Sequence, residues 1–159
     1  MKQRIDYFKA SPGAMKTMMD MERYLASCYR SKKNIDRKLI ELIKIRVSQL
    51  NGCAYCIDIH VKDAIEIGEN IQRIYSLNAW RDTTFYSDIE RSALAWAEAN
   101  TLISINGIPD ELYKNIAQHF NEEQIVDLTL TITTINAWNR IGISFRPQAG
   151  SYNPGDFDI

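Results

Sequence analysis

The chain has 159 residues, 45% hydrophobic and 25% charged, so we expect one domain (residues 1–159) with a real core rather than a disordered chain. Nineteen basic against twenty acidic residues give a net charge of -1, which offers no general attraction to nucleic acid or to an anionic membrane. No stretch approaches the ~18 apolar residues of a membrane span, and residues 1–10 lack the apolar core of a signal peptide. We therefore expect a cytoplasmic protein.

The apolar pattern predicts an all-α fold, since the chain holds only seven Gly and four Pro and shows no alternation long enough for a sheet. We expect a bundle of about six to seven helices. In chain order the predicted helices span residues 12–29, 36–50, 53–67, 71–77, 87–102 and 109–120, followed by a long helix from 121 through 139.

Residue types at the predicted boundaries support these helices. Ser87 is followed three residues later by Glu90, and Asn121 by Gln124. At this spacing each side chain accepts a hydrogen bond from the backbone N–H of the other residue, which caps the helix. Pro12 falls in the first turn of its helix, where the missing N–H costs no hydrogen bond.

Two segments outside the helices also have an expected role. The basic residues 30–34 should form a solvated loop between the first two long helices. Residues 147–159 contain Pro, Gly and two aromatic side chains, so we expect an extended tail that docks on a neighbour.

The run Cys-Ala-Tyr-Cys-Ile-Asp-Ile-His that begins at Cys53 carries most of the functional information. In a helix, Cys53, Cys56 and His60 place two sulfurs and an imidazole on one side. The preceding Asn51-Gly52 pair breaks the helix, so Cys53 stands at a helix N-terminus, where free N–H groups favour a thiolate. Cytoplasmic thiols rest reduced, which favours a catalytic or metal-binding pair over a structural disulfide.

Glu41 lies twelve residues before Cys53, on the preceding predicted helix. A short Asn-Gly turn would make the two helices an antiparallel hairpin, and at about 1.5 Å per residue Glu41 and His60 reach broadly similar depths below the turn. Glu41 can then orient His60, which can take the proton of the Cys56 thiol. The sequence predicts a Glu41–His60–Cys56 triad with Cys53 as the resolving thiol.

This triad suits the reduction of a small organic hydroperoxide. The Cys56 thiolate would attack the distal oxygen, giving an alcohol and a Cys56 sulfenic acid. Cys53 would condense with the sulfenic acid to form a disulfide, and an external dithiol would restore both thiols by exchange. The cycle requires no bound cofactor and no metal.

Other functions of the same residues stay open. The thiol pair could serve a general thiol–disulfide oxidoreductase, or a non-enzymatic oligomeric binding protein that senses redox state. A structural zinc site needs four ligands, and beyond the three residues of this run only Cys28 and His119 are obvious donors, at no zinc-like spacing. Two inert buried cysteines are the remaining alternative.

At these residues the chain resembles the AhpD-like alkylhydroperoxidase branch of the carboxymuconolactone decarboxylase family. The pattern of that family is Glu, eleven residues, CxxC, three residues and His, and Glu41, Cys53, Cys56 and His60 fit it at every spacing. Three further segments are also similar and extend the resemblance over most of the chain, namely residues 4–7, 42–56 and 135–140.

The resemblance implies an all-α helical bundle, normally assembled into dimers, trimers or hexamers. It implies Cys56 as the peroxidatic thiol, Cys53 as the resolving thiol, and His60 with Glu41 as a proton relay. In the namesake branch the reductant is a lipoyl-bearing adaptor protein and the partner is a peroxiredoxin. The namesake enzyme has a further histidine just before the second cysteine, where this chain has Tyr55, which is no base near neutral pH.

Asn136 and Asn139 lie on or beside the apolar face of the last predicted helix. A buried amide needs hydrogen-bond partners. Backbone groups, a neighbouring subunit and the site itself all remain possible partners, with structural satisfaction favoured.

Overall fold

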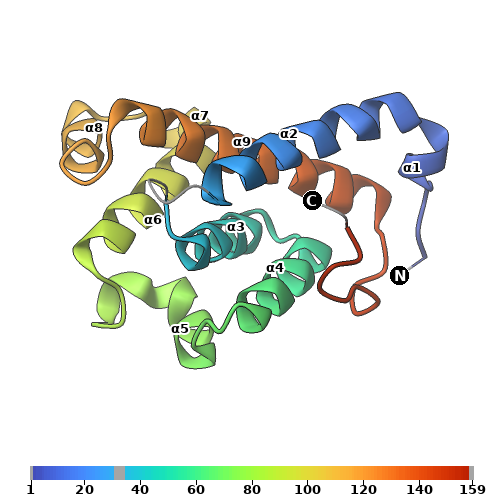
Figure 1. Cartoon of the computed structure of the whole chain (residues 1–159), viewed down its shortest axis with the longest axis horizontal. Helices are drawn as coiled ribbons and strands as arrows, with labels where there is room; N and C mark the ends of the chain where they lie inside the picture. The colour runs from blue at the N-terminus through green and yellow to red at the C-terminus, as the bar shows by residue number, and fades with distance from the viewer. Residues whose placement is uncertain (1, 31–34, 158–159) are drawn as a thin grey trace.

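The computed structural model of the chain describes residues 2–30 and 35–157, and every regular element in these residues is helical, as the sequence predicts (Figure 1). The elements are a 3-10 helix, η1 (Leu77–Asp82), and the α-helices α1 (Tyr7–Ala10), α2 (Pro12–Arg30), α3 (Arg37–Asn51), α4 (Ala54–Glu66), α5 (Ile71–Ser76), α6 (Asp88–Thr101), α7 (Ile103–Asn106), α8 (Asp110–Ile116) and α9 (Glu122–Phe145).

The seven predicted helices correspond to α2, α3, α4, α5, α6, α8 and α9. Both predicted capping boxes are present, at Ser87 before α6 and at Asn121 before α9, and Pro12 is the first residue of α2. The three short elements α1, α7 and η1, of four to six residues each, are additional to the predicted helices. Of the predicted loop, residues 31–34 lie outside the described part of the chain.

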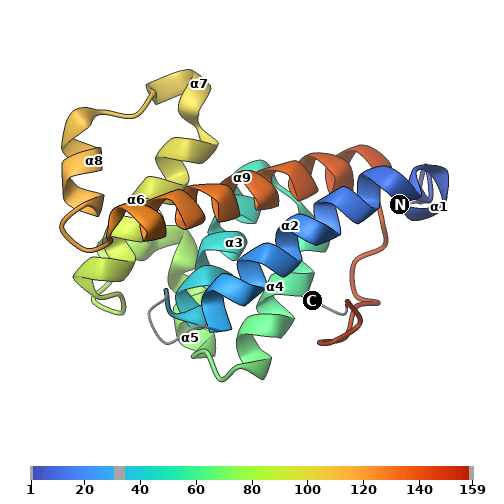
Figure 2. The same cartoon turned by 45° about the horizontal axis from the view of Figure 1, so that its top comes forward.

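Helix α3 lies at the centre of the fold, with α4, α6 and α9 packed against it (Figure 2). All ten residues from 39 to 48 are buried, and Leu42, Ile43, Ile45 and Val47 have no exposed surface. Each such aliphatic side chain stabilises the fold by roughly 1.5–3 kcal/mol on burial. A helix buried all round is normally apolar throughout, so the polar residues of α3 require partners on the surrounding helices.

Helices α2 and α9 run side by side across one face of the molecule (Figures 1 and 2). The Tyr24 hydroxyl donates to Asp127 Oδ1 at 3.1 Å, and the Tyr29 hydroxyl is hydrogen-bonded to Thr131. These contacts fix α2 against α9. No helix in the described residues is both long enough and apolar enough to cross a membrane.

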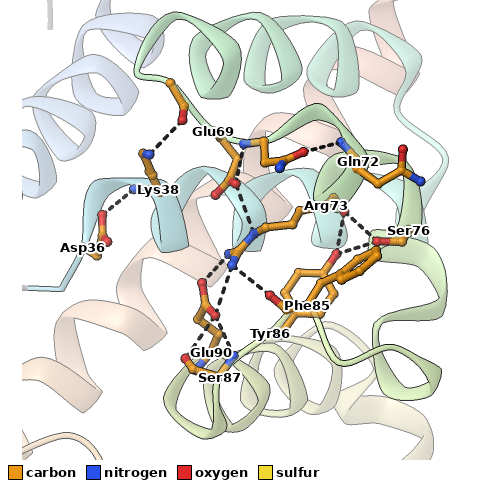
Figure 3. A network of polar contacts seen from close by, with 12 residues as sticks. Asp36, Lys38, Glu69, Gln72, Arg73, Ser76, Phe85, Tyr86, Ser87 and Glu90 are labelled. Atoms are coloured by element: carbon orange, nitrogen blue, oxygen red, sulfur yellow. Dashed lines mark hydrogen bonds and ion pairs between the residues drawn. The ribbon is translucent and has the colours of Figure 1, made fainter.

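Arg73 on α5 is the centre of a polar network that joins α5 to the loop after α4 and to the start of α6 (Figure 3). Its Nε lies 3.1 Å from Glu69 Oε1, and its terminal nitrogens contact Glu90 and the Phe85 carbonyl. Beside the network, Lys38 Nζ donates to the Gly68 carbonyl at 2.7 Å. The loop that follows α4 is thereby held to α3 and α5, and Arg73 links it to α6.

Glu98 on α6 joins two further elements to that helix. Its Oε1 accepts hydrogen bonds from Arg46 Nε on α3 at 2.7 Å and from Trp80 Nε1 on η1 at 2.9 Å, and its Oε2 accepts one from Arg81. Burial alone would raise the pKa of Glu98, but the hydrogen bonds from Trp80, Arg46 and Arg81 outweigh burial and hold it below its ordinary value.

We predict that Glu98→Gln lowers the free energy of unfolding by about 2 kcal/mol at neutral pH, because charge-assisted hydrogen bonds are lost. The carboxyl has a lower pKa folded than unfolded. Its contribution is therefore fully present above the unfolded value and is lost as the pH falls through the folded value. Urea denaturation over a range of pH measures this effect. The difference in the free energy of unfolding between wild type and variant should shrink as the pH falls into the acid range.

Glu111→Gln is the matched control, because Glu111 pairs with Lys114 on the surface and both side chains are mostly exposed. This variant should match wild type at every pH. If the loss of unfolding free energy in Glu98→Gln stayed constant down to acid pH, that result would contradict a charge-based role for Glu98.

Candidate active site

The turn between α3 and α4 is set by Gly52 and by two asparagines of α9. Gly52 has φ 72° and ψ 32°, a left-handed conformation that glycine adopts without strain. The Asn51 side-chain amide donates to Oδ1 of Asn136 at 2.9 Å and to Oδ1 of Asn139 at 2.8 Å, and the Asn139 amide donates to Ser48 Oγ at 3.0 Å. The buried asparagines therefore find partners within the chain and hold the turn that precedes Cys53.

The two cysteines lie at the N-terminus of α4, as the sequence predicts. Cys53 is the N-cap residue, Cys56 lies in the first turn, and the two sulfurs form a disulfide. Cys53 is 2% exposed and Cys56 4%. A reagent must consequently reach the sulfurs through a cavity rather than from open solvent. The third cysteine, Cys28, is free and stands apart from the pair.

His60 and Glu41 are brought together by the hairpin of α3 and α4. The distance from His60 Nδ1 to Glu41 Oε2 is 2.9 Å, and both side chains are almost fully buried. Since Glu41 comes early in α3 and His60 in the middle of α4, this contact requires α4 to run back along α3. The predicted proximity of Glu41 and His60 is therefore confirmed.

The Glu41 carboxyl is ionised inside the protein. Burial would raise its pKa, but the hydrogen bond with His60 and the charge of Lys44 outweigh burial, so its pKa lies below the ordinary value. A carboxylate only accepts hydrogen bonds, so Nδ1 of His60 must be the donor. In the neutral imidazole Nε2 then carries no proton and is available as a base.

A cavity of about 280 Å³ lies beside Cys56 and His60. Its wall is rich in aromatic side chains, among them Phe8, Tyr29, Tyr55, Trp138, Tyr152 and Phe157. Its size is close to the lower end of small-molecule pockets. Burial raises the pKa of the Tyr55 hydroxyl above its ordinary value, so Tyr55 contributes an aromatic surface and no base at neutral pH.

The C-terminal strap (residues 146–157) closes one side of this cavity. The backbone N–H of Gly150 donates to Asp58 Oδ2 at 2.8 Å, and Lys62 Nζ donates to the Tyr152 carbonyl at 2.9 Å. The Tyr152 hydroxyl donates to Asp63 Oδ1 at 2.7 Å. The described part of the predicted tail thus docks on α4, the helix that carries the cysteines and His60.

Four charged residues that sequence reasoning did not single out also line the cavity, namely Glu22, Arg37, Lys44 and Asp63. The sequence offers only weak signals that two of these residues belong to the site: Lys44 interrupts an apolar run, and Asp63 lies three residues after His60. Nothing in the sequence around Glu22 or Arg37 indicates such a role. Glu41, His60 and Asp63 each present one possible ligand atom within 4.8 Å of the others. Glu41 is hydrogen-bonded to His60, and Asp63 accepts a hydrogen bond from Tyr152. Because these partners already occupy the possible ligand atoms, we assign no metal to this group.

Gly142 on α9 allows the disulfide to lie against that helix. A Cβ atom at this position would come 3.0 Å from Cys53 Sγ and 3.4 Å from Cys56 Sγ. The first of these distances is shorter than an ordinary carbon–sulfur contact. The missing side chain therefore leaves room for the reactive sulfurs.

We predict that Gly142→Ala lowers the free energy of unfolding of the oxidised protein by about 1–3 kcal/mol, through crowding against the sulfurs. A loss of stability would be informative, because replacing Gly by Ala in a helix interior normally stabilises the protein by about 1 kcal/mol. Gly13→Ala in α2 is the matched control, since a Cβ there meets nothing within 4 Å. Thermal unfolding that showed Gly142→Ala to be as stable as Gly13→Ala would contradict the close contact.

Comparisons with known proteins agree with this architecture. The sequence model of the carboxymuconolactone decarboxylase family matches residues 12–99. The uncharacterized protein YdfG of Bacillus subtilis (strain 168) is 50% identical over 151 residues, covering 95% of this chain and 99% of YdfG.

Solved structures show the same fold. A protein of unknown function from Agrobacterium tumefaciens, described as a putative antioxidant defence protein AhpD, is 40% identical with a TM-score of 0.88 and covers 95% of this chain and 100% of its own. The debrominase Bmp8 is 22% identical with a TM-score of 0.79, covering 91% of this chain and 75% of its own, a likeness in fold alone.

The matched region contains Glu41, Cys53, Cys56 and His60, so the family assignment and the site rest on the same helical hairpin. The family model spans more than half of the chain, and the Bacillus relative extends the similarity over nearly all of it. This chain belongs to the carboxymuconolactone decarboxylase family, among its AhpD-like members.

Proposed function

We propose that the protein is a thiol-dependent peroxidase that reduces small organic hydroperoxides through Cys53 and Cys56. The observation that carries the proposal is the pairing of His60 with the buried Glu41 carboxylate in the same cavity wall as Cys56. A disulfide pair alone would fit many redox proteins. A base with a fixed tautomer, one helical turn after Cys56 and in the same cavity wall, favours activation of a thiol for nucleophilic attack.

The first step forms a sulfur–oxygen bond and breaks the peroxide bond. His60 Nε2 takes the proton of the Cys56 thiol, and the thiolate attacks the distal oxygen of the hydroperoxide. The leaving alkoxide takes the proton back from His60 and departs as an alcohol. Sulfur is oxidised by two electrons to the sulfenic acid, and the peroxide is reduced by two.

The second step closes the disulfide that the structure contains. The Cys53 thiol attacks the Cys56 sulfenic acid, a sulfur–sulfur bond forms and water leaves. An external dithiol then reduces the disulfide by exchange and is itself oxidised to a disulfide. A lipoyl-type dithiol or a redox adaptor protein is the reductant we propose, and no bound cofactor takes part.

The aromatic cavity supports an organic rather than an inorganic peroxide as substrate. Its wall offers apolar surface for a small hydrocarbon body next to the reacting sulfur. The same fold serves a debrominase in Bmp8, so the proposal depends on the site rather than on the fold. The alternative is a general thiol–disulfide oxidoreductase or a redox-sensing oligomeric binding protein. Such a protein would exchange disulfides but turn over peroxide slowly or not at all.

Two further expectations belong to this proposal. The cycle consumes a dithiol, which fits the reducing conditions of a cytoplasmic location. The resemblance to the family leads us to propose a homo-oligomer, a dimer, trimer or hexamer, and we expect no nucleic-acid or membrane partner.

We predict that Cys56→Ser abolishes the reduction of cumene hydroperoxide with dihydrolipoamide as reductant, because the attacking sulfur is lost. Cys53→Ser should consume one equivalent of peroxide and then stop, because the sulfenic acid has no resolving thiol. Steady-state peroxide consumption measures the first effect, and trapping of the sulfenic acid by dimedone with mass spectrometry measures the second.

Cys28→Ser is the matched control, because it removes the free cysteine and leaves the pair intact. This variant should keep wild-type turnover. Full turnover in Cys56→Ser would disprove the assigned nucleophile. A reduced wild-type protein that exchanges disulfides but consumes no peroxide would favour the oxidoreductase alternative.

A further inference from the structure

A second buried charge pair lies in the wall of the same cavity. Lys44 is one helical turn after Glu41 on α3, and its Nζ lies 3.0 Å from Glu22 Oε2 on α2. The Trp138 indole N–H on α9 donates to the other Glu22 oxygen at 3.1 Å. Both members of the pair have less than a tenth of their side chains exposed. Three helices therefore meet at the buried Glu22 carboxylate.

A buried ion pair is a poor source of stability. Removing two charges from water costs several kcal/mol per ion, and apolar residues of similar volume often do as well or better. Lys44 and Glu22 also line the cavity together with Cys56 and His60, rather than a remote part of the core. The position of the pair thus points to a role in the site.

The charge balance around Glu41 shows what that role is. The ionisable groups that face this region come from five parts of the chain: Tyr7 on α1, Glu22 and Tyr29 on α2, Arg37 on α3, Tyr55, His60, Asp63 and, once reduced, Cys56 on α4, and Tyr152 on the strap. Helix α9 contributes Ile135, Trp138 and Gly142, which do not titrate. Arg37 is exposed to solvent, so Lys44 is the buried cation among three carboxyl groups in this wall.

Lys44 remains charged in this setting. Burial alone would lower its pKa, but Glu22 and Glu41 outweigh burial and raise it above the ordinary value. The same ammonium group favours the ionised form of Glu41. The cation is therefore coupled to both carboxylates at once, with Glu22 fixing its position.

We propose that Lys44, held in place by Glu22, is a positioning residue whose charge keeps the Glu41–His60 pair from taking up a second proton at neutral pH. The inference rests on the proposed function, in which His60 Nε2 must be unprotonated to accept the proton of Cys56. Without the ammonium group, the carboxylate and imidazole together bind a further proton more tightly. The imidazolium that results has an N–H on both nitrogens and is no base.

The test is a pH titration of the histidine side chains by ¹⁵N NMR in the reduced protein. The chain contains two histidines, and His119, which follows α8 and does not line the cavity, is an internal reference. In Lys44→Met the signals of His60 should change at a higher pH than in wild type, because the charge of Lys44 no longer opposes a further proton on the Glu41–His60 pair. The signals of His119 should not move.

Two further variants separate charge from packing. Lys44→Arg keeps the positive charge and should titrate as wild type does. Lys44→Gln removes the charge but its amide can still donate to Glu22, so it should shift His60 as Lys44→Met does. If Lys44→Met does not fold, Lys44→Gln provides the test.

Either of two results would overturn the proposal. One is an unshifted His60 titration in a folded, charge-free variant, which would make Lys44 a purely structural residue. The other is an equal shift in Lys44→Arg, which would make side-chain shape the cause. The measurement needs no peroxide, so a protein without peroxidase turnover could still show the shift, and the two proposals can fail separately.

Discussion

The hydrogen bond between Glu41 and His60 is the constraint on which the site depends. A buried carboxylate without a partner would cost several kcal/mol, so α4 must present His60 at the depth of Glu41. This fixes the register of the α3–α4 hairpin. The tight turn at Gly52 then places Cys53 at the N-cap and Cys56 in the first turn of α4. One polar contact therefore aligns the base with the thiol pair.

Hydrogen bonds from other buried polar residues of α3 also fix the position of that helix. Four of its buried polar residues each bond a different surrounding helix: Glu41 bonds His60 on α4, Lys44 bonds Glu22 on α2, Arg46 bonds Glu98 on α6, and Ser48 bonds Asn139 on α9. Apolar packing around α3 is not directional and would tolerate a rotation or a slip. Hydrogen bonds to four different helices would all break in such a shift, so they specify a single arrangement.

Sequence reasoning reaches as far as local patterns extend. The main helices follow from apolar spacing and two capping boxes, and the Glu41–His60 contact follows because both residues lie on one hairpin whose turn is evident at Asn51-Gly52. Glu22, Gly142 and the strap come from segments far away in the chain. No spacing rule connects them to Cys56, since their positions depend on how α2, α9 and the tail pack in three dimensions.

This division has a chemical consequence. The thiol pair and its base lie within residues 12–99, the part matched by the family model, whereas α9 and the strap lie beyond it. Much of the cavity wall, including Trp138, Tyr152 and Phe157, comes from that second part. The hairpin carries the two cysteines, His60 and Glu41, but it cannot define the shape of the space in front of them. Under the proposed function, the chemistry of the sulfur would therefore depend mainly on the hairpin, and the choice of substrate would depend largely on the side chains that α9 and the strap add to the cavity wall.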